Sequence, residues 1–385
     1  MSEVAASPAT STPAAPTSRA AIVRWALPVV GVVVAVLFYL FGGDRWLSVA
    51  NFTMIYAIAA LGLNVLSGYA GQVSLGIAFF MAIGGEVAAW MGSVPTTGTF
   101  GHAGLNLPFY IWLPAAGLAA AAAGALIGPT ALRLRGFYLG IVSLALIFLG
   151  QHLVLNVAQL QPYTGGPAGR SVAGPMLGGF DFNNPTDIAG VTISREQAFF
   201  VLILLVLVIT AVFVRNVARS RIGRAFEAVR DNEVAAVIMG VNLFTAKMAA
   251  FVFSSFLAGI AGALLASYSE YIRLSTDQTQ QWGLVFSIQF VAAIIIGGVA
   301  SVWGSILGAA FVFALPTLID KFSLVPQSTT NPNPLLSNLN TIIYGLLIVV
   351  FLLFEPGGVV GLIRRVQLLA RRVSQPSGKG EARIS

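Results

Sequence analysis

Long apolar segments follow one another through most of this 385-residue sequence, and only 9% of its residues are charged. Soluble globular proteins carry about 25% charged residues, because a water-facing surface needs them. A chain of this length with so few charges cannot cover such a surface, which excludes a soluble enzyme. The absence of cysteine also excludes a disulfide-stapled secreted scaffold. The sequence therefore predicts an all-α polytopic membrane protein.

Ten apolar runs are candidates for membrane-crossing helices, each of which needs about 20 mostly apolar residues. They lie at 22–41, 52–67, 73–92, 108–128, 136–157, 197–214, 247–268, 283–299, 303–319 and 338–354. Several are short or rich in glycine, so eight or nine full crossings remain open beside ten. With ten crossings and both termini cytoplasmic, 16 of the 21 Lys and Arg residues fall on the cytoplasmic side. The positive-inside rule therefore favours ten, and it accounts for the net charge of +7 without nucleic acid.

The membrane domain is expected over residues 21–360, between two polar tails. Residues 1–20 are mostly Ala, Pro, Ser and Thr, and we expect a disordered cytoplasmic tail because they cannot bury enough apolar surface to fold. Residues 361–385 are expected to form a basic cytoplasmic tail. Two connections are long. The outer loop 158–196 is rich in turn-forming residues and is expected to be irregular. The inner segment 215–246 is expected to be helical instead.

The inner segment carries charges at helical spacing. Arg224, Glu227 and Arg230 are interleaved with alanine and valine, which predicts one short amphipathic helix, about 224–239, along the cytoplasmic face. Taken on its residues alone, this pattern is best explained by a helix held at the membrane surface by lipid headgroups.

Two stretches of small and polar residues interrupt the apolar runs, at 67–76 (SGYAGQVSLG) and 297–305 (GGVASVWGS). The first is either a cytoplasmic hairpin turn or a broken helix whose free backbone groups line a water-filled path. Both lie at inward-facing turns of the ten-helix topology. The candidate path residues are the polar or small residues in and near the runs: Asn64, Gly71, Gln72, Ser74, Glu86 and Gln289.

Glu86 is the ionisable residue placed deepest in an apolar run. A carboxylate at membrane depth costs roughly 2.5–3.5 kcal/mol on insertion scales, so it is expected to face the bundle interior, a partner subunit or water. The alternative is a protonated or hydrogen-bonded glutamate near the outer third of its helix, without a role in transport.

The sequence lacks the usual chemistry of an enzyme or a pump. It has no GxxxxGK[ST] segment, so it cannot hydrolyse ATP by a P-loop. Two distant histidines and no cysteine make a zinc or haem site untenable, and we expect no catalytic residue, no metal and no cofactor. Glu86 stands alone, without the chain of carboxylates expected of a proton-driven pump. These absences favour a passage that is powered or gated by another protein.

Several segments resemble the high-affinity branched-chain amino acid ABC importer permeases of the LivM type. Those segments are 60–76 (ALGLNVLSGYAGQVSLG), 132–138 (LRLRGFY) with 142–145, 220–240, 258–262 with Lys247, and 296–304 (IGGVASVWG). Within 220–240, Glu233, Ala235, Ala236 and Gly240 match the acidic–alanine–alanine–glycine pattern of the family's coupling loop.

The resemblance implies a non-catalytic permease in the bacterial inner (plasma) membrane, forming half of a translocation path. Its implied partners are a second, related permease, two ATPase subunits and an extracytoplasmic binding protein. The inner helix would then dock on an ATPase, with Arg224 and Arg230 pairing acids there and the small side chains allowing close approach. Closely related permeases serve importers of urea and short-chain amides, so that substrate class is an alternative. A stand-alone channel, a secondary carrier or a non-transporting scaffold subunit are alternatives of another class.

Overall fold

A computed structural model describes residues 37–40, 42–95, 102–131, 137–177, 180–188, 191–275 and 282–322, with isolated residues between 342 and 361. The long helices are α2 (Asp44–Leu63), α3 (Ile77–Gly92), α4 (Phe109–Ala131), α5 (Phe137–Asn156), α7 (Arg195–Arg219), α10 (Leu243–Tyr268), α11 (Leu284–Gly297) and α12 (Val302–Phe322). The short helices are the π-helix η1 (Asn64–Tyr69), α6 (Gln161–Thr164), the 3₁₀-helix η2 (Gly166–Ala168), α8 (Arg221–Asp231) and α9 (Glu233–Ile238).

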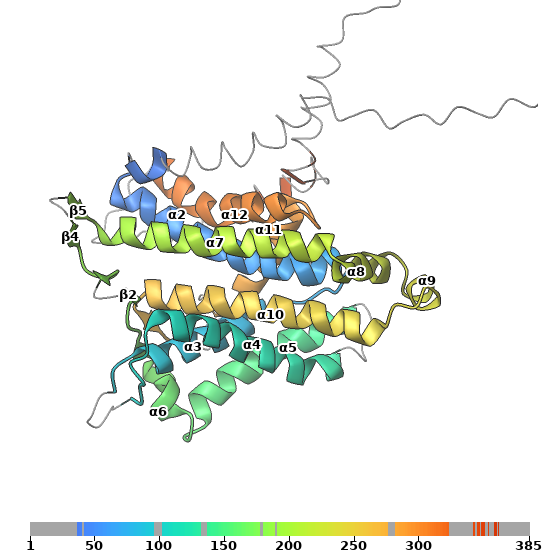
Figure 1. Cartoon of the computed structure of the whole chain (residues 1–385), viewed down its shortest axis with the longest axis horizontal. Helices are drawn as coiled ribbons and strands as arrows, with labels where there is room; N and C mark the ends of the chain where they lie inside the picture. Colours follow the sequence, from blue (N-terminus) through green and yellow to red (C-terminus); the bar gives the residue numbers. More distant parts are fainter. Residues whose placement is uncertain are drawn as a thin grey trace, which may run out of the picture.

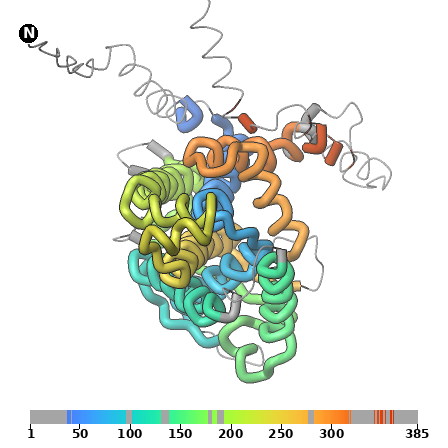
Figure 2. The backbone as a smooth tube through the Cα atoms, turned by 90° about the vertical axis from the view of Figure 1, so that its right-hand side faces the viewer, coloured from blue at the N-terminus to red at the C-terminus, as the bar shows by residue number. Residues whose placement is uncertain are grey.

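The helices form one bundle with two distinct ends (Figure 1). Short strands lie at one end, here called the strand end, and α8 and α9 lie at the other, the α8–α9 end. Both α2 and α7 start at the strand end, where the Ser194 hydroxyl donates to Asp44 Oδ1 at 3.0 Å. Figure 2 shows the bundle turned by 90°, with α8 and α9 towards the viewer.

Helix α10 lies at the centre and packs on α2, α3 and α4. Small residues allow these helices to approach closely, as expected where lipid supplies no hydrophobic drive between them. A Cβ atom on Gly62 of α2 would lie 2.9 Å from Leu257 Cβ of α10, and one on Gly262 of α10 would clash with the backbone of Met81 in α3. The core around them is apolar and fully buried, with Ile58, Met81 and Leu265 each at 0% exposure.

Eight of the ten predicted runs match described helices. Among the described residues, five spans are long and apolar enough to cross a membrane: Asp44–Tyr69, Phe109–Pro129, Tyr138–Asn156, Arg195–Arg219 and Leu243–Tyr268; three shorter apolar helices accompany them. The first run is described only at its last residues and the tenth only at isolated positions. The tail 1–20, and the tail 361–385 beyond its first residue, lie outside the described residues.

The outer loop is more regular than predicted. Strand β1 (Arg170–Ser171) pairs with β6 (Tyr271–Ile272), β2 (Met176–Leu177) with β3 (Phe180–Asp181), and β4 (Thr186–Ile188) with β5 (Val191–Ile193), all antiparallel. The prediction of an irregular loop was therefore wrong. The strands are only two or three residues long, too short for a periodic pattern, and the β1–β6 pair joins segments about 100 residues apart.

Candidate functional site

The inner segment folds against the end of the bundle as two helices. On α8, Gly223, Phe226 and Val229 are buried at a spacing of three residues, while Arg224 and Glu227 are exposed. Ser220 caps α8 because its hydroxyl accepts hydrogen bonds from the amides of residues 222 and 223. The predicted amphipathic helix is therefore present, with its charged face towards solvent.

The predicted single helix 224–239 is wrong in one respect, because the chain breaks at Asn232. The backbone of Asn232 is extended (φ −161°, ψ 110°), and its side-chain oxygen accepts from the amides of Val234 and Ala235, each at 3.0 Å. Asparagine favours this capping geometry over a helix interior. Helix α9 is thereby turned away from α8. Helix α9 ends at Ile238, and Gly240, just after the capping residue Met239, has a φ of +84° that suits a residue without a Cβ.

Helix α8 contacts the stretch 67–76, predicted as either a hairpin turn or a helix break, directly. Arg230 Nη1 donates to the Gly68 carbonyl in η1 at 3.1 Å. Gly71 has φ +68°, and a Cβ there would lie 2.7 Å from Arg230 Cγ. Arg230 of the inner helix therefore contacts Gly71 of the stretch 67–76.

Helix α9 reaches the same stretch through the start of α10. Lys247 Nζ pairs with Glu233 Oε1 at 2.5 Å, and the Lys247 side chain is only 12% exposed. The Lys247 carbonyl accepts from Gln72 Nε2 at 3.3 Å. Glu233 is 38% exposed, so only the Lys247 side of this ion pair is buried.

The two predicted small-polar stretches meet through Asn64, which is completely buried. Asn64 Nδ2 donates to the Ser301 carbonyl at 3.1 Å, and the Ala300 amide donates to Asn64 Oδ1 at 3.0 Å. Ala300 has a positive φ of 57°, uncommon for a residue with a Cβ. The α2–α3 break and the α11–α12 turn are thus held together.

Gln72, Ser74 and Gly76 of the irregular backbone after η1 are buried, while Gly71 and Val73 are exposed. Ser143 of α5 accepts from the Leu75 amide at 2.9 Å, and Ser287 of α11 accepts from the Ala78 amide at 3.1 Å. Ser74, itself buried, accepts from the Gly76 amide. Side chains from neighbouring helices thus satisfy backbone amides around the start of α3.

Two predicted path residues lie outside this cluster. Glu86 is in the second half of α3, towards the strand end, and Gln289 is half-buried in α11. Asn64, Gly71, Gln72 and Ser74 do come together with Arg230 and Glu233. Sequence reasoning missed Asn232 and did not place Lys247 in a site, although the Asn-Glu pair is a recognisable helix start.

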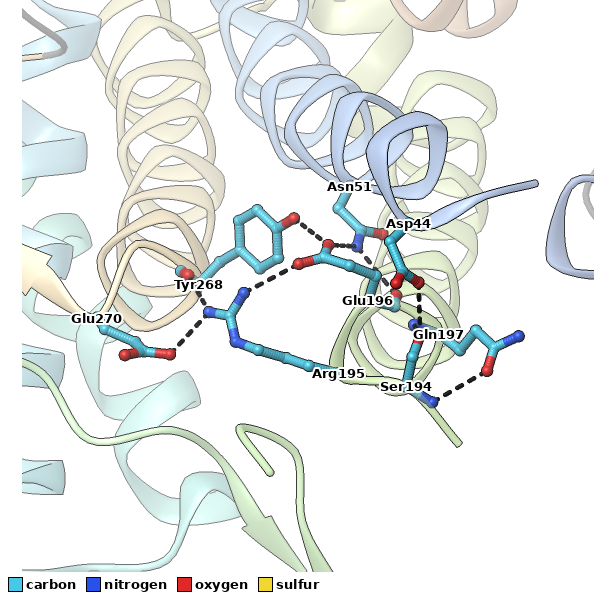
Figure 3. Close-up of polar contacts among 8 residues, drawn as sticks. All are labelled: Asp44, Asn51, Ser194, Arg195, Glu196, Gln197, Tyr268 and Glu270. Carbon is cyan, nitrogen blue, oxygen red and sulfur yellow. Dashed lines mark hydrogen bonds and ion pairs between the residues drawn. The ribbon is translucent and has the colours of Figure 1, made fainter. Parts of the chain in front are cut away.

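A second polar cluster joins α2, α7 and α10 at the strand end (Figure 3). Arg195 pairs with Glu196 and Glu270, each at 3.0 Å, and donates to the Tyr268 carbonyl. Glu196 in turn accepts from Asn51 and from the Tyr268 hydroxyl. No group of three or more potential metal-ligating side chains occurs among the residues that the structure describes.

Residues 45–352 match the protein family described as "Branched-chain amino acid transport system / permease component". The chain belongs to this family. The LivM proteins of Salmonella typhimurium LT2 and Escherichia coli K12, high-affinity branched-chain amino acid transport system permeases, are each 34% identical to it over 288 residues. These matches cover 71% of this chain and 64% of each relative, so the chain spans just under two thirds of their length.

A more distant relative is the ribose import permease RbsC of Haemophilus influenzae, 24% identical over 281 residues, which are 71% of this chain and 76% of the relative. No solved structure matches the chain. Family membership confirms the resemblance noted in the sequence. With five helices of membrane-spanning length, it makes the chain a multi-pass ABC-transporter permease of the bacterial inner membrane.

Proposed function

We propose that this chain is the membrane subunit of an ATP-driven importer of branched-chain amino acids. It would supply half of the translocation path, beside a second, related permease. Two ATPase subunits would dock at the α8–α9 end and an extracytoplasmic binding protein at the strand end. The observation that carries the proposal is the direct contact of α8 and the start of α10 with the stretch between α2 and α3, together with the ion pair that joins α9 to the start of α10.

The contacts suggest how ATPase closure would reach the membrane helices. A push on α8 acts on Gly68 through Arg230, and a push on α9 acts on Gln72 through Glu233 and Lys247. Asn64 passes the displacement to the α11–α12 turn. The two helices and their contacts would move together as a rigid body against the bundle.

Helix α9 has the surface expected of a docking element. Val234, Ile238 and Met239 are 71%, 79% and 83% exposed, so apolar side chains project from a charged end of the molecule. An exposed apolar patch of this kind marks a protein or membrane contact. We infer an apolar ATPase groove rather than lipid, because α9 follows a helix whose outward face carries Arg224 and Glu227.

The path itself is proposed to run along α3. Its start is lined by Gln72 and Ser74, and Glu86 lies nearer the strand end, while Gln289 of α11 is a further candidate. This assignment follows from the buried polar atoms along α3.

The substrate and the class of transporter are tested by uptake into cells with and without the gene. Labelled leucine, isoleucine, valine and urea are each measured with and without depletion of ATP. We expect deletion to abolish ATP-dependent uptake of the amino acids. Loss of urea uptake alone would move the substrate to the urea and amide class. Uptake that needs the gene but survives ATP depletion would establish a channel or secondary carrier instead.

Coupling is tested by Arg230→Met, with Arg221→Met as the matched control, since both arginines are exposed on α8 but only Arg230 contacts Gly68. We expect Arg230→Met to lose uptake while ATP hydrolysis persists. Glu233→Arg, which breaks the pair with Lys247, and Gly240→Trp should abolish uptake without preventing insertion. Ile238→Asp should remove the ATPase from the purified complex. Normal copurification would indicate that α9 lies on lipid.

A further inference from the structure

Two buried, oppositely charged side chains near the strand end take no part in the coupling contacts. Both carboxylate oxygens of Glu86 are buried without a hydrogen-bond partner in the described part of the chain. Arg170 is only 2% exposed. Its Nη1 donates to the Tyr163 carbonyl at 2.5 Å, while its Nε is buried without a partner among those residues. Burying charges in this way is costly, which favours a functional reason for keeping them.

The fold brings the two residues towards each other. The β1–β6 register sets Arg170 opposite Ile272, and the Cδ1 atom of Ile272 lies against Gly85, the neighbour of Glu86. Ser93, at the end of α3, donates to the Ser171 carbonyl at 3.2 Å and so fixes β1 on this helix.

The charges interact without touching. Burial lowers the pKa of the Arg170 guanidinium, and the nearby Glu86 carboxylate opposes that change. Yet neither residue forms an ion pair within 4.0 Å in the described part of the chain. A pair kept only to stabilise the fold would be expected in direct contact, because only close pairing offsets the cost of removing both charges from water.

We propose that Glu86 and Arg170 hold the two charged ends of an α-amino acid as it passes along α3. The Glu86 carboxylate accepts from the substrate ammonium, and the Arg170 guanidinium donates to the substrate carboxylate, through charge-assisted hydrogen bonds of about 2.8 Å. A zwitterion carries both charges on adjacent carbons, so one molecule can bridge two groups that do not meet. The inference rests on the proposed importer function and names residues that recognise its substrate class.

The surroundings suit an aliphatic substrate side chain. Ile272 and Trp282 both lie against Gly85, where an added Cβ would come within 2.7 Å of Ile272 and 3.2 Å of Trp282. The charged pair therefore has apolar neighbours on α3, β6 and the start of α11. A neutral solute such as urea could form hydrogen bonds with either group but carries no charge to offset the cost of burying both.

The test compares Glu86→Gln, Arg170→Gln and the double variant in cells that carry the complete importer, with labelled leucine as the probe. Each single variant is expected to reduce ATP-dependent leucine uptake at least tenfold. The double variant is expected to take up leucine no faster than either single variant. Recovery of the wild-type rate in the double variant would show that Glu86 and Arg170 only neutralise each other's charge and do not bind the substrate. That result would overturn the proposal, as would single variants with wild-type uptake.

Arg273→Gln is the matched control, because it removes an exposed charge at the same end, and it should keep uptake. Unchanged basal ATP hydrolysis by the purified complexes would show that the variants assemble. Should the Arg170→Gln complex not assemble, Glu86→Gln decides alone, since it removes only a buried charge. A wild-type importer that carries urea but not leucine would overturn this site while keeping the importer. A wild-type complex without any ATP-dependent uptake would overturn both the substrate site and the proposed importer function.

Discussion

Replacing Asn64 with leucine should separate the role of the α2–α3 break from general stability. Leucine has a similar size but cannot accept from the Ala300 amide or donate to the Ser301 carbonyl, so two backbone groups lose their partner. Leaving a buried group unsatisfied costs about 1–3 kcal/mol. The two groups are only partly buried, and hydrogen bonds between membrane helices average roughly 0.6 kcal/mol. We therefore expect a total loss of about 2–4 kcal/mol.

The assay is thermal unfolding of the purified complex together with ATP-driven leucine uptake. For a chain of this size, 2–4 kcal/mol corresponds to a fall of about 2–5 °C in melting temperature. Asn51→Leu is the matched control: Asn51 lies in α2, the helix that precedes Asn64, is also fully buried, and donates to Glu196 of α7 at the strand end. Both variants should lose stability, but Asn64→Leu should also uncouple ATP hydrolysis from uptake. Equal uptake per folded complex in the two variants would refute the reasoning.

Three further predictions concern packing, strain and charge. Gly262→Ala should lower the melting temperature of the complex by several degrees because its Cβ meets the Met81 backbone, whereas Gly140→Ala, with only Val73 Cγ1 at 3.9 Å, should be neutral. Ala300→Gly should raise stability slightly, by about 1 kcal/mol or less, measured in the same way, because it relieves a positive φ. Burial and the positive charge of Arg170 both lower the pKa of His102, so histidine-labelled NMR should find it below the usual value, and Arg170→Gln should raise it. Because the pKa of His102 is lower in the folded state than in the unfolded state, His102 leaves the folded protein at full stability above the unfolded pKa of about 6.5. The stability falls as the pH falls below that value.

The helices were predictable because each one leaves a local pattern. The expected run 247–268 became α10, which starts four residues earlier because Asn242 caps it by accepting from the Thr245 amide. The inner helix was predictable for the same reason, since its buried and charged positions alternate with helical period. Only its break at Asn232 was missed, although asparagine followed by an acidic residue is typical of a helix start.

The contacts that make the site were not predictable, because they join distant segments. Asn64 and Ser301 are separated by 237 positions, and Arg230 and Gly68 by 162. Composition marked both stretches as unusual but could not show that they meet. Arg170 illustrates the same limit: it sits in a turn-rich loop, and only the β1–β6 pairing brings it into the bundle. Glu86 could be singled out because a lone carboxylate in an apolar run is conspicuous.

The contacts of α8 converge on a π-helical turn, which suggests what moves. In η1 the Ala70 amide donates to the Val65 carbonyl, five residues back, so this turn holds one residue more than an α-helical turn. Such a turn can convert to α-helix by a one-residue shift of its hydrogen bonds, at less cost than unfolding α2. We therefore expect ATP to change amide hydrogen exchange at 64–72 in the complete importer. Arg230→Met, which releases Gly68, should abolish that change while exchange in the centre of α10 stays the same. An ATP-dependent change that persists in Arg230→Met would show that α8 does not drive this turn.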